Sequence, residues 1–139
     1  MVHIFFGLLL LLSVNLCAQS GSQGAKGESQ NQESGMQLVL IDRFVVPSDA
    51  KTEFLQRMSI NRNFIRKLPG FIGDAAYQQI GGNGESNYVT VAVGRNAEAI
   101  ENAKKAVTAE YQRQGFDLQG MLKRLNIRID RAVYKRLED

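Results

Sequence analysis

A strand pattern followed at once by a helix pattern occurs twice in this chain, and that order constrains the fold more than any other feature. Residues 38–46 read LVLIDRFVV and stop at a proline, after which apolar side chains recur at three- and four-residue steps. Residues 88–93 form another β-branched run, which an alanine-rich amphipathic pattern follows. Further strand patterns at residues 71–80 and 127–134 complete the order. The chain is therefore predicted to be α+β, with a ferredoxin-like split β-α-β-β-α-β fold.

The ends of the two helices are predicted from residues that start and stop helices. Ser48 and Asp49 are candidate N-terminal caps of the first helix, and the Pro-Gly pair at residues 69–70 is expected to end it. Asn96 is a candidate cap of the second helix, which Gly115 is expected to end. The first helix is expected to turn one face inward, with Phe54, Met58, Asn61, Ile65 and Leu68.

The first strand is apolar on both faces, which is unusual for a sheet covered on one side. One face carries Leu38, Leu40, Phe44 and Val46, and the other carries Val39, Ile41 and Val45. Such a strand is normally covered on both faces, and two helices cover only one. The second cover is either a partner subunit or residues 116–126, a predicted loop with a short helical turn. A symmetric homodimer is the simpler cover, so a homodimer is expected.

The N-terminal segment is predicted to be a signal peptide spanning residues 1–18. Residues 4–12 read IFFGLLLLL, an apolar run shorter than the roughly 20 residues that a bilayer span needs. Cleavage after Ala18 is expected to leave Gln19 at the mature terminus. Lipid attachment at Cys17 is the alternative, but Leu16 stands where a small residue is wanted. The protein is thus expected to be exported, either secreted or periplasmic, with no transmembrane span.

Composition separates a tether from the domain and excludes several classes of site. Residues 19–36 are rich in Gly, Ser and Gln and are predicted to be a flexible tether, ahead of a domain at residues 37–137. Cys17 is the only cysteine, so the mature domain has no disulfide. The net charge is +3, and its late basic residues lack the interleaved aromatics of a nucleic-acid site, so no nucleic-acid partner is expected.

Three stretches resemble the antibiotic-biosynthesis-monooxygenase superfamily. They are residues 40–55 (LIDRFVVPSDAKTEFL), 68–78 (LPGFIGDAAYQ) and 87–107 (NYVTVAVGRNAEAIENAKKAV). With the last strand, the resemblance covers residues 37–137. It implies a dimer in which two sheets pack into an α+β barrel, with a pocket between sheet and helices in each subunit.

The resemblance also implies a range of chemistry. Members include cofactor-free oxygenases that act on phenolic or quinol substrates, haem-degrading enzymes, and proteins with no assigned chemistry. In the haem-degrading branch the first strand carries an Asn where this chain has Asp42, and the third strand ends in a Trp where this chain has Gly94. That branch takes a His ligand from its second helix region, whereas His3 is the only histidine here. Neither a haem nor any other cofactor is therefore expected.

Two polar residues interrupt apolar faces and are the candidate catalytic residues. Asp42 alternates with Leu40 and Phe44, and a desolvated carboxylate there could act as a general base on a phenol. The alternative is an ion pair with a basic residue on a neighbouring strand, such as Arg131. Asn61 lies within the inward stripe of the first helix, either as a hydrogen-bonding group for a ligand or as a buried amide paired with backbone or water.

Tyr77 and Tyr88 are candidate ligand-binding residues, with packing in the core or at an interface as the alternative. No metal cluster and no Ser-His-Asp set is visible in the sequence. The leading prediction is an exported cofactor-free monooxygenase acting on a small aromatic or quinol-type molecule. The alternative is a non-catalytic module for small-ligand binding or assembly. A pocket that holds Asp42 and Asn61 favours the former, and one filled by Phe44, Met58 and Phe64 favours the latter.

Export gives the first testable prediction. Expressed with its N-terminal segment in a secreting bacterium, the protein is expected outside the cytoplasm and starting at Gln19, because the apolar run suits signal peptidase processing. Intact-mass spectrometry identifies the terminus. A diacylglycerol on Cys17 would show anchoring instead, and an uncut cytoplasmic product would contradict export altogether.

Overall fold

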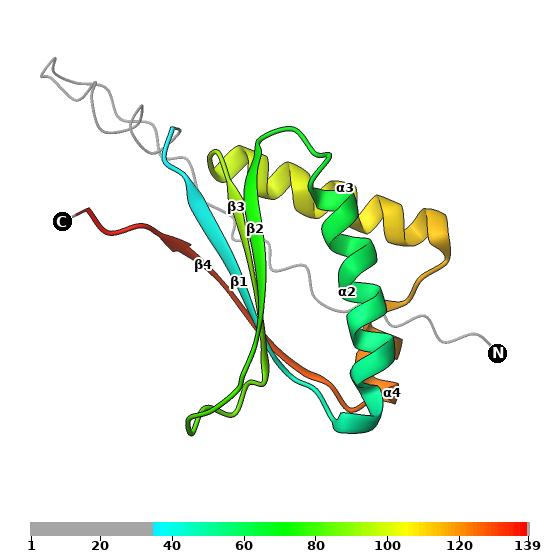
Figure 1. Cartoon of the computed structure of the whole chain (residues 1–139). Helices are drawn as coiled ribbons and strands as arrows, with labels where there is room; N and C mark the ends of the chain where they lie inside the picture. Colours follow the sequence, from blue (N-terminus) through cyan, green and yellow to red (C-terminus); the bar gives the residue numbers. More distant parts are fainter. Residues whose placement is uncertain (1–34, 139) are drawn as a thin grey trace, which may run out of the picture.

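A computed structural model describes residues 35–138, which form one sheet with all its helices on one face (Figure 1). Residues 1–34, and with them the predicted signal peptide and nearly all of the tether, lie outside the described residues. The elements in chain order are β1 (Leu38–Val45), a 3-10 turn η1 (Ser48–Ala50), α2 (Lys51–Ile65), β2 (Phe71–Gln78), β3 (Tyr88–Gly94), α3 (Ala97–Gln114), α4 (Leu118–Arg124) and β4 (Arg128–Lys135).

The sheet has the strand order β2-β3-β1-β4, and every neighbouring pair is antiparallel. β1 is an inner strand, and its Asp42 lies opposite Thr90 on β3 and Arg131 on β4. Two strand-helix units in this order are the split β-α-β-β-α-β fold, so the predicted fold class is confirmed. The helical turn expected within residues 116–126 is the short helix α4.

The second helix begins and ends as predicted. The first helix has no side-chain cap and ends at Ile65, before the Pro-Gly pair at residues 69–70. The Asn96 side chain accepts a hydrogen bond of 2.9 Å from the Ala99 N–H, and Gly115 ends α3 in the left-handed conformation at φ 62°. The prediction that Ser48 or Asp49 caps the first helix is wrong. Both residues belong to the 3-10 turn closed by the Ala50 N–H on the carbonyl of residue 47, and no side chain caps α2.

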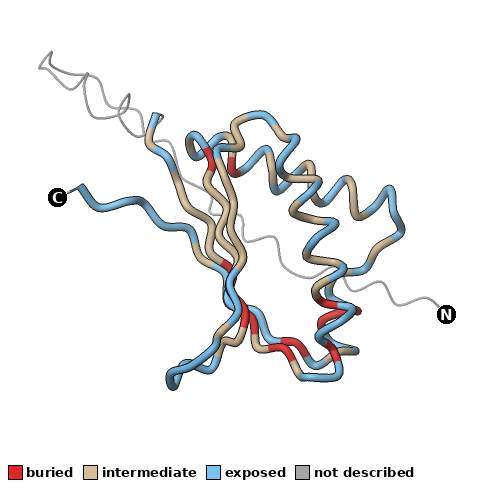
Figure 2. Tube along the Cα trace, in the orientation of Figure 1, coloured by how far each residue is buried: buried red, intermediate tan, exposed pale blue. Residues whose placement is uncertain are grey.

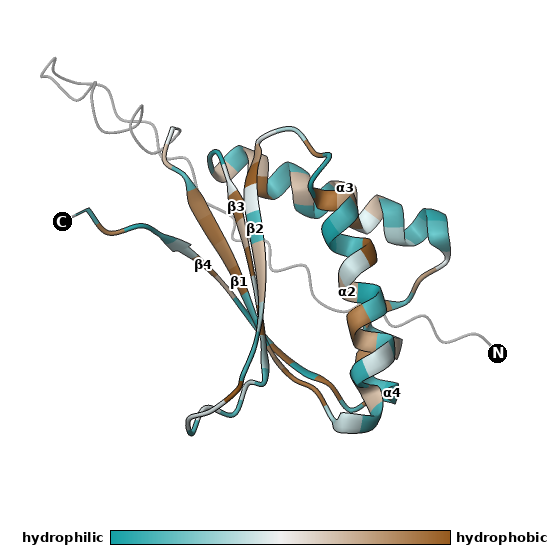
Figure 3. Ribbon diagram, viewed as in Figure 1, coloured by the Kyte–Doolittle hydropathy of each residue, from teal (hydrophilic) through white to brown (hydrophobic). Residues whose placement is uncertain are grey.

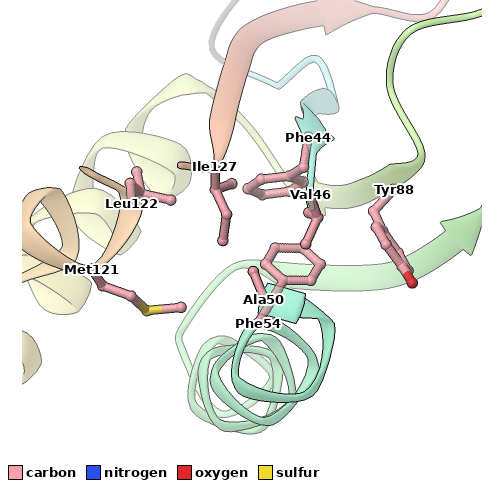
Figure 4. Close-up of a cluster of buried hydrophobic side chains, with 8 residues drawn as sticks. All are labelled: Phe44, Val46, Ala50, Phe54, Tyr88, Met121, Leu122 and Ile127. Atoms are coloured by element: carbon pink, nitrogen blue, oxygen red, sulfur yellow. The ribbon is translucent and has the colours of Figure 1, made fainter. Parts of the chain in front are cut away.

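Buried side chains gather at one end of the molecule, where α4 and the start of α2 meet the sheet (Figure 2). Phe54 lies at the centre of this cluster, with its ring centroid 4.9 Å from that of Phe44 and 5.2 Å from that of Tyr88. The cluster shown in Figure 4 consists of Phe44, Val46, Ala50, Phe54, Tyr88, Met121, Leu122 and Ile127. Burial of this kind contributes roughly 1.5–3 kcal/mol for each large side chain, so this end anchors the helices.

A second close contact joins the far end of the sheet to α3. Gly94 ends β3, and a Cβ built on it would lie 2.7 Å from Cδ1 of the buried Ile100. Glycine therefore lets the first turn of α3 approach the strand. Between this contact and the main cluster, most residues that face each other across the sheet-helix layer are only partly buried (Figure 2).

The opposite face of the sheet is apolar along β1 except at Arg43, which pairs with Asp130 of β4, and it carries none of the described helices. β1 is apolar along most of its length (Figure 3), and on this outer face Val39, Ile41 and Val45 are half-buried. The alternative that residues 116–126 cover it is wrong, because α4 packs into the cluster on the helical side. Among residues 35–138, no helix is both long and apolar enough to cross a bilayer.

Candidate active site

A cavity of about 460 Å³ lies between the helix-facing side of the sheet and helices α2 and α3. Its volume is within the range of roughly 300–1,000 Å³ typical of small-molecule sites. Asp42 and Asn61 both line it, as the leading prediction required. Phe44 and Met58 form part of its wall and leave space for an aromatic ring.

Asp42 lies on the sheet side of the cavity, and β4 supplies its partner. Both carboxylate oxygens accept from the Arg131 guanidinium, Oδ1 from Nε at 2.6 Å and Oδ2 from Nη2 at 2.7 Å. Asp42 is buried, at 7% exposure, whereas the Arg131 side chain is half-exposed. The hydrogen bond to Asp42 raises the pKa of Arg131. The ion pair that the sequence left open is therefore present, and each oxygen keeps a lone pair for a ligand proton.

Asn61 lies across the cavity on α2, and its partner is a tyrosine on α3. The Asn61 Nδ2 donates to the Tyr111 hydroxyl at 2.7 Å. Arg57 precedes Asn61 by one helical turn and stacks on Phe116, 3.5 Å from the ring centroid, and beside Tyr111 at 4.9 Å. Burial raises the pKa of Tyr111, while the charge of Arg57 and the Asn61 hydrogen bond oppose this shift.

Neither Arg57 nor Tyr111 was predicted from the sequence as a site residue. Spacing gave one usable signal, because residues four apart share a helix face and Arg57 and Asn61 have this spacing. The contact between Asn61 and Tyr111 spans 50 residues of sequence. It depends on how α2 and α3 cross, which local patterns do not specify.

A second carboxylate, Asp74 on β2, is held by Arg62 of α2 and by Arg66, the C-cap residue of that helix. Arg66 Nε lies 2.8 Å from its Oδ1, and Arg62 Nε contacts Oδ2. Burial raises the pKa of Asp74, but the hydrogen bonds from Arg66 and Arg62 outweigh it and lower the pKa overall. The cluster joins the last turns of α2 to the sheet and bounds the cavity at that end.

The structure brings Asp42 and Asn61 to one cavity and leaves Tyr77 and Tyr88 outside it. Tyr77 is 59% exposed near the end of β2. Tyr88 is buried in the main cluster against Phe54. Within residues 35–138, no group of His, Cys, Asp and Glu side chains is arranged to hold a metal ion.

Solved structures with this fold include proteins with oxygenase chemistry. A proposed monooxygenase from Shewanella loihica PV-4 is 18% identical with a TM-score of 0.59, over 75% of this chain and 97% of its own. SnoaB, a cofactor-independent oxygenase from Streptomyces nogalater, is 17% identical with a TM-score of 0.57, over 75% and 96%. The haem-degrader MhuD from Mycobacterium tuberculosis, solved with two haems in its active site, is 19% identical with a TM-score of 0.56, over 73% and 97%. No protein-family model matches the chain, and a comparison with curated proteins finds no match.

These similarities confirm the predicted ferredoxin-like α+β fold. At such identities they define the fold, and the reaction has to be argued from the cavity. The described residues include no histidine or cysteine that could bind a haem iron in this cavity. At Gly94, where the resemblance implies a tryptophan, Ile100 occupies the space that a side chain would need.

The Asp74 cluster predicts a specific acid sensitivity. The pKa of Asp74 is lowered from its ordinary value of 3.8, so the unfolded chain binds the proton first as the pH falls. The contribution of this cluster to the free energy of unfolding is therefore complete above about pH 3.8 and is lost as the pH falls below it. Asp74→Asn is expected to lower the free energy of unfolding by about 1–3 kcal/mol at pH 7, and by less at pH 3.

Urea unfolding at the two pH values measures this difference. Glu85→Gln is the control, because the Glu85 side chain is 80% exposed in its pair with Arg128. A surface pair contributes little, so its loss is expected to change stability by less than about 1 kcal/mol. An Asp74→Asn effect that stays constant between pH 7 and pH 3 would contradict the lowered pKa.

Proposed function

We propose that the protein is a cofactor-free monooxygenase that acts on a small aromatic or quinol-type molecule bound in the cavity. The observation that carries the proposal is the placement of a buried carboxylate, Asp42, and an amide, Asn61, on the wall of a largely apolar cavity. The fold is shared with a cofactor-independent oxygenase, which supports the same class of chemistry.

The chemistry needs a substrate that can supply its own electrons. Asp42 accepts a proton from the phenolic or activated C–H group, and the substrate anion that forms reduces O₂. In a substrate with an activated methylene, one oxygen atom enters the product as a carbonyl at that carbon, and the other leaves as water with the two hydrogens of the methylene. In a hydroquinone, one oxygen atom enters at a ring C–H to give a hydroxyquinone, and the other leaves as water with the two hydrogens that the ring system loses. No external reductant is required. General-base assistance contributes roughly 10²–10⁴ in rate when the base lies within hydrogen-bond reach.

The alternative is a non-catalytic module that binds a small ligand or assembles with a partner. The bidentate pair of Asp42 and Arg131 favours it, because this geometry is typical of a structural ion pair. In that case Asp42 joins β1 to the edge strand β4 and the cavity binds its ligand without turnover.

Two further proposals concern where and in what form the protein acts. Export is supported by the apolar run at residues 4–12 and the polar segment that follows it. A homodimer is supported by the outer face of the sheet, on which half-buried apolar side chains of β1 have no described helix over them. A partner sheet packed there would complete an α+β barrel.

Oxygen uptake tests the enzymatic proposal. With a panel of hydroquinones and anthrone-like phenols, the wild type is expected to exceed the uncatalysed rate, and Asp42→Asn is expected to lower that excess by about 10²–10⁴ because the base is removed. Glu85→Gln, in the turn between β2 and β3 and outside the cavity, is the control and is expected to keep full activity.

A thermal melt of each variant accompanies the oxygen measurement. Background rates from a folded wild type would contradict the enzymatic proposal. Loss of folding in Asp42→Asn, with no wild-type activity, would identify Asp42 as a structural ion-pair partner and favour the binding module.

Light scattering tests the dimer. The wild type is expected at twice the monomer mass at micromolar concentration, and Ile41→Asp is expected to be monomeric because it would place an unpaired charge in the sheet-to-sheet contact. Val133→Asp is the matched control, since Val133 is 43% exposed on the helix-facing side of the edge strand. A monomeric wild type would contradict the dimer.

A further inference from the structure

The charges around the cavity are unevenly balanced, and the imbalance lies at one residue. Among the described residues, four basic side chains line the cavity: Arg57, Arg62, Lys104 and Arg131. Three of them contact a carboxylate: Arg131 with Asp42, Arg62 with Asp74 and Lys104 with Glu101. Arg57 instead donates to the neutral amide oxygen of Gln114 at 2.8 Å.

The Arg57 guanidinium is held in place without being neutralised. Its Nε and Nη2 are buried, and neither has a hydrogen-bond partner within residues 35–138. Stacking on Phe116 and beside Tyr111 fixes its plane. A buried charge without a counter-ion is costly, so its retention in a cavity wall calls for a partner that the protein does not itself supply.

Glu110 is the acidic group nearest to this cation on α3, and it serves other partners. Hydrogen bonds from Arg113 and Gln114 lower the pKa of Glu110 to about 2. Gln114 lies between Glu110 and Arg57, since its amide N–H donates to Glu110 and its amide oxygen accepts from Arg57. Glu110 thus attracts Arg57 without contacting it, because the Gln114 amide lies between them.

The Tyr111 hydroxyl offers the contact that a ligand can use. It lines the cavity, and its oxygen accepts from Asn61 Nδ2. The hydroxyl proton of Tyr111 is not used in this hydrogen bond, so it can be donated to a ligand in the cavity. The positive charge beside the ring makes the phenol a better hydrogen-bond donor, and a hydrogen bond to an ionised acceptor is about twice as strong as a neutral one.

We infer that the cavity binds an organic carboxylate: an apolar ring whose carboxylate accepts a hydrogen bond from Tyr111 and is balanced by the charge of Arg57. This inference rests on the proposed function only in taking the cavity as the ligand site. Apolar walls suit the ring, and one hydroxyl donor beside one cation that contacts no carboxylate suits a singly charged group. Arg57 is a positioning residue, since it acts through Tyr111 and the field in the cavity.

Calorimetry with a matched pair of probes tests the inference. Protein purified after expression of the whole sequence is titrated with 2-naphthoate and with 2-naphthamide, which has the same ring and no charge. The acid is expected to bind at least about tenfold more tightly, the usual effect of one hydrogen bond to a charged group.

Three variants assign the preference to its source. Tyr111→Phe, which removes only an oxygen, and Arg57→Met are each expected to reduce the ratio of acid to amide affinity toward one. Arg124→Met is the control, because it removes the same charge from the exposed pair with Glu53 outside the cavity and is expected to keep the ratio.

Equal affinities for the two probes, binding of neither, or a preference that survives both Tyr111→Phe and Arg57→Met would overturn the inference. A measured preference without oxygen uptake would support the inference and contradict the oxygenase proposal. Oxygen uptake with neutral hydroquinones, without a preference for the acid, would support the oxygenase proposal and contradict the carboxylate inference. The two proposals can therefore fail independently.

Discussion

Phe54 packs between Phe44 of β1 and Tyr88 of β3, and the placement of everything else on the helical side follows from this contact. It attaches the first turn of α2 to the two inner strands at one end of the sheet, where α4 adds Met121 and Leu122. Because the apolar cluster is not central, the rest of α2 and α3 extends over the sheet with fewer buried contacts. The cavity occupies that interval, so an off-centre core and a ligand site are two results of one packing arrangement.

The polar groups of the cavity are paired across elements rather than along them. Asp42 and Arg131 connect neighbouring strands, whereas Asn61 and Tyr111 connect two helices. Each pair holds its members in defined positions before any ligand arrives, which limits the reorganisation that binding requires. Arg57 differs from both pairs because its fixed charge contacts no carboxylate among the described residues. The cavity is therefore positively charged near α3, whereas on the sheet side Asp42 and Arg131 neutralise each other.

Much of the fold could be predicted because it depends on local patterns. β-branched runs, the Asn96 cap and the Gly115 stop are properties of a few adjacent residues, and the alternation along β1 correctly placed Asp42 on the helical face. The predicted caps Ser48 and Asp49 were wrong because the proline just before them starts a 3-10 turn. Within that turn their side chains are not at the end of α2. The roles of Arg57 and Tyr111 could not be predicted, because they arise where two helices distant in sequence cross.

The contact between Gly94 and Ile100 has an evolutionary consequence. A side chain at residue 94 would collide with a buried isoleucine that lies 2.7 Å from the Cβ position. An aromatic residue could therefore enter there only if the Ile100 side chain rotated away, residue 100 shortened or the start of α3 moved. Shortening residue 100 first opens a void that lowers stability, so the two changes are epistatic and each is disfavoured alone. Substitution at residue 94 is therefore tied to substitution at residue 100, and a large side chain is accommodated most readily when both positions change together.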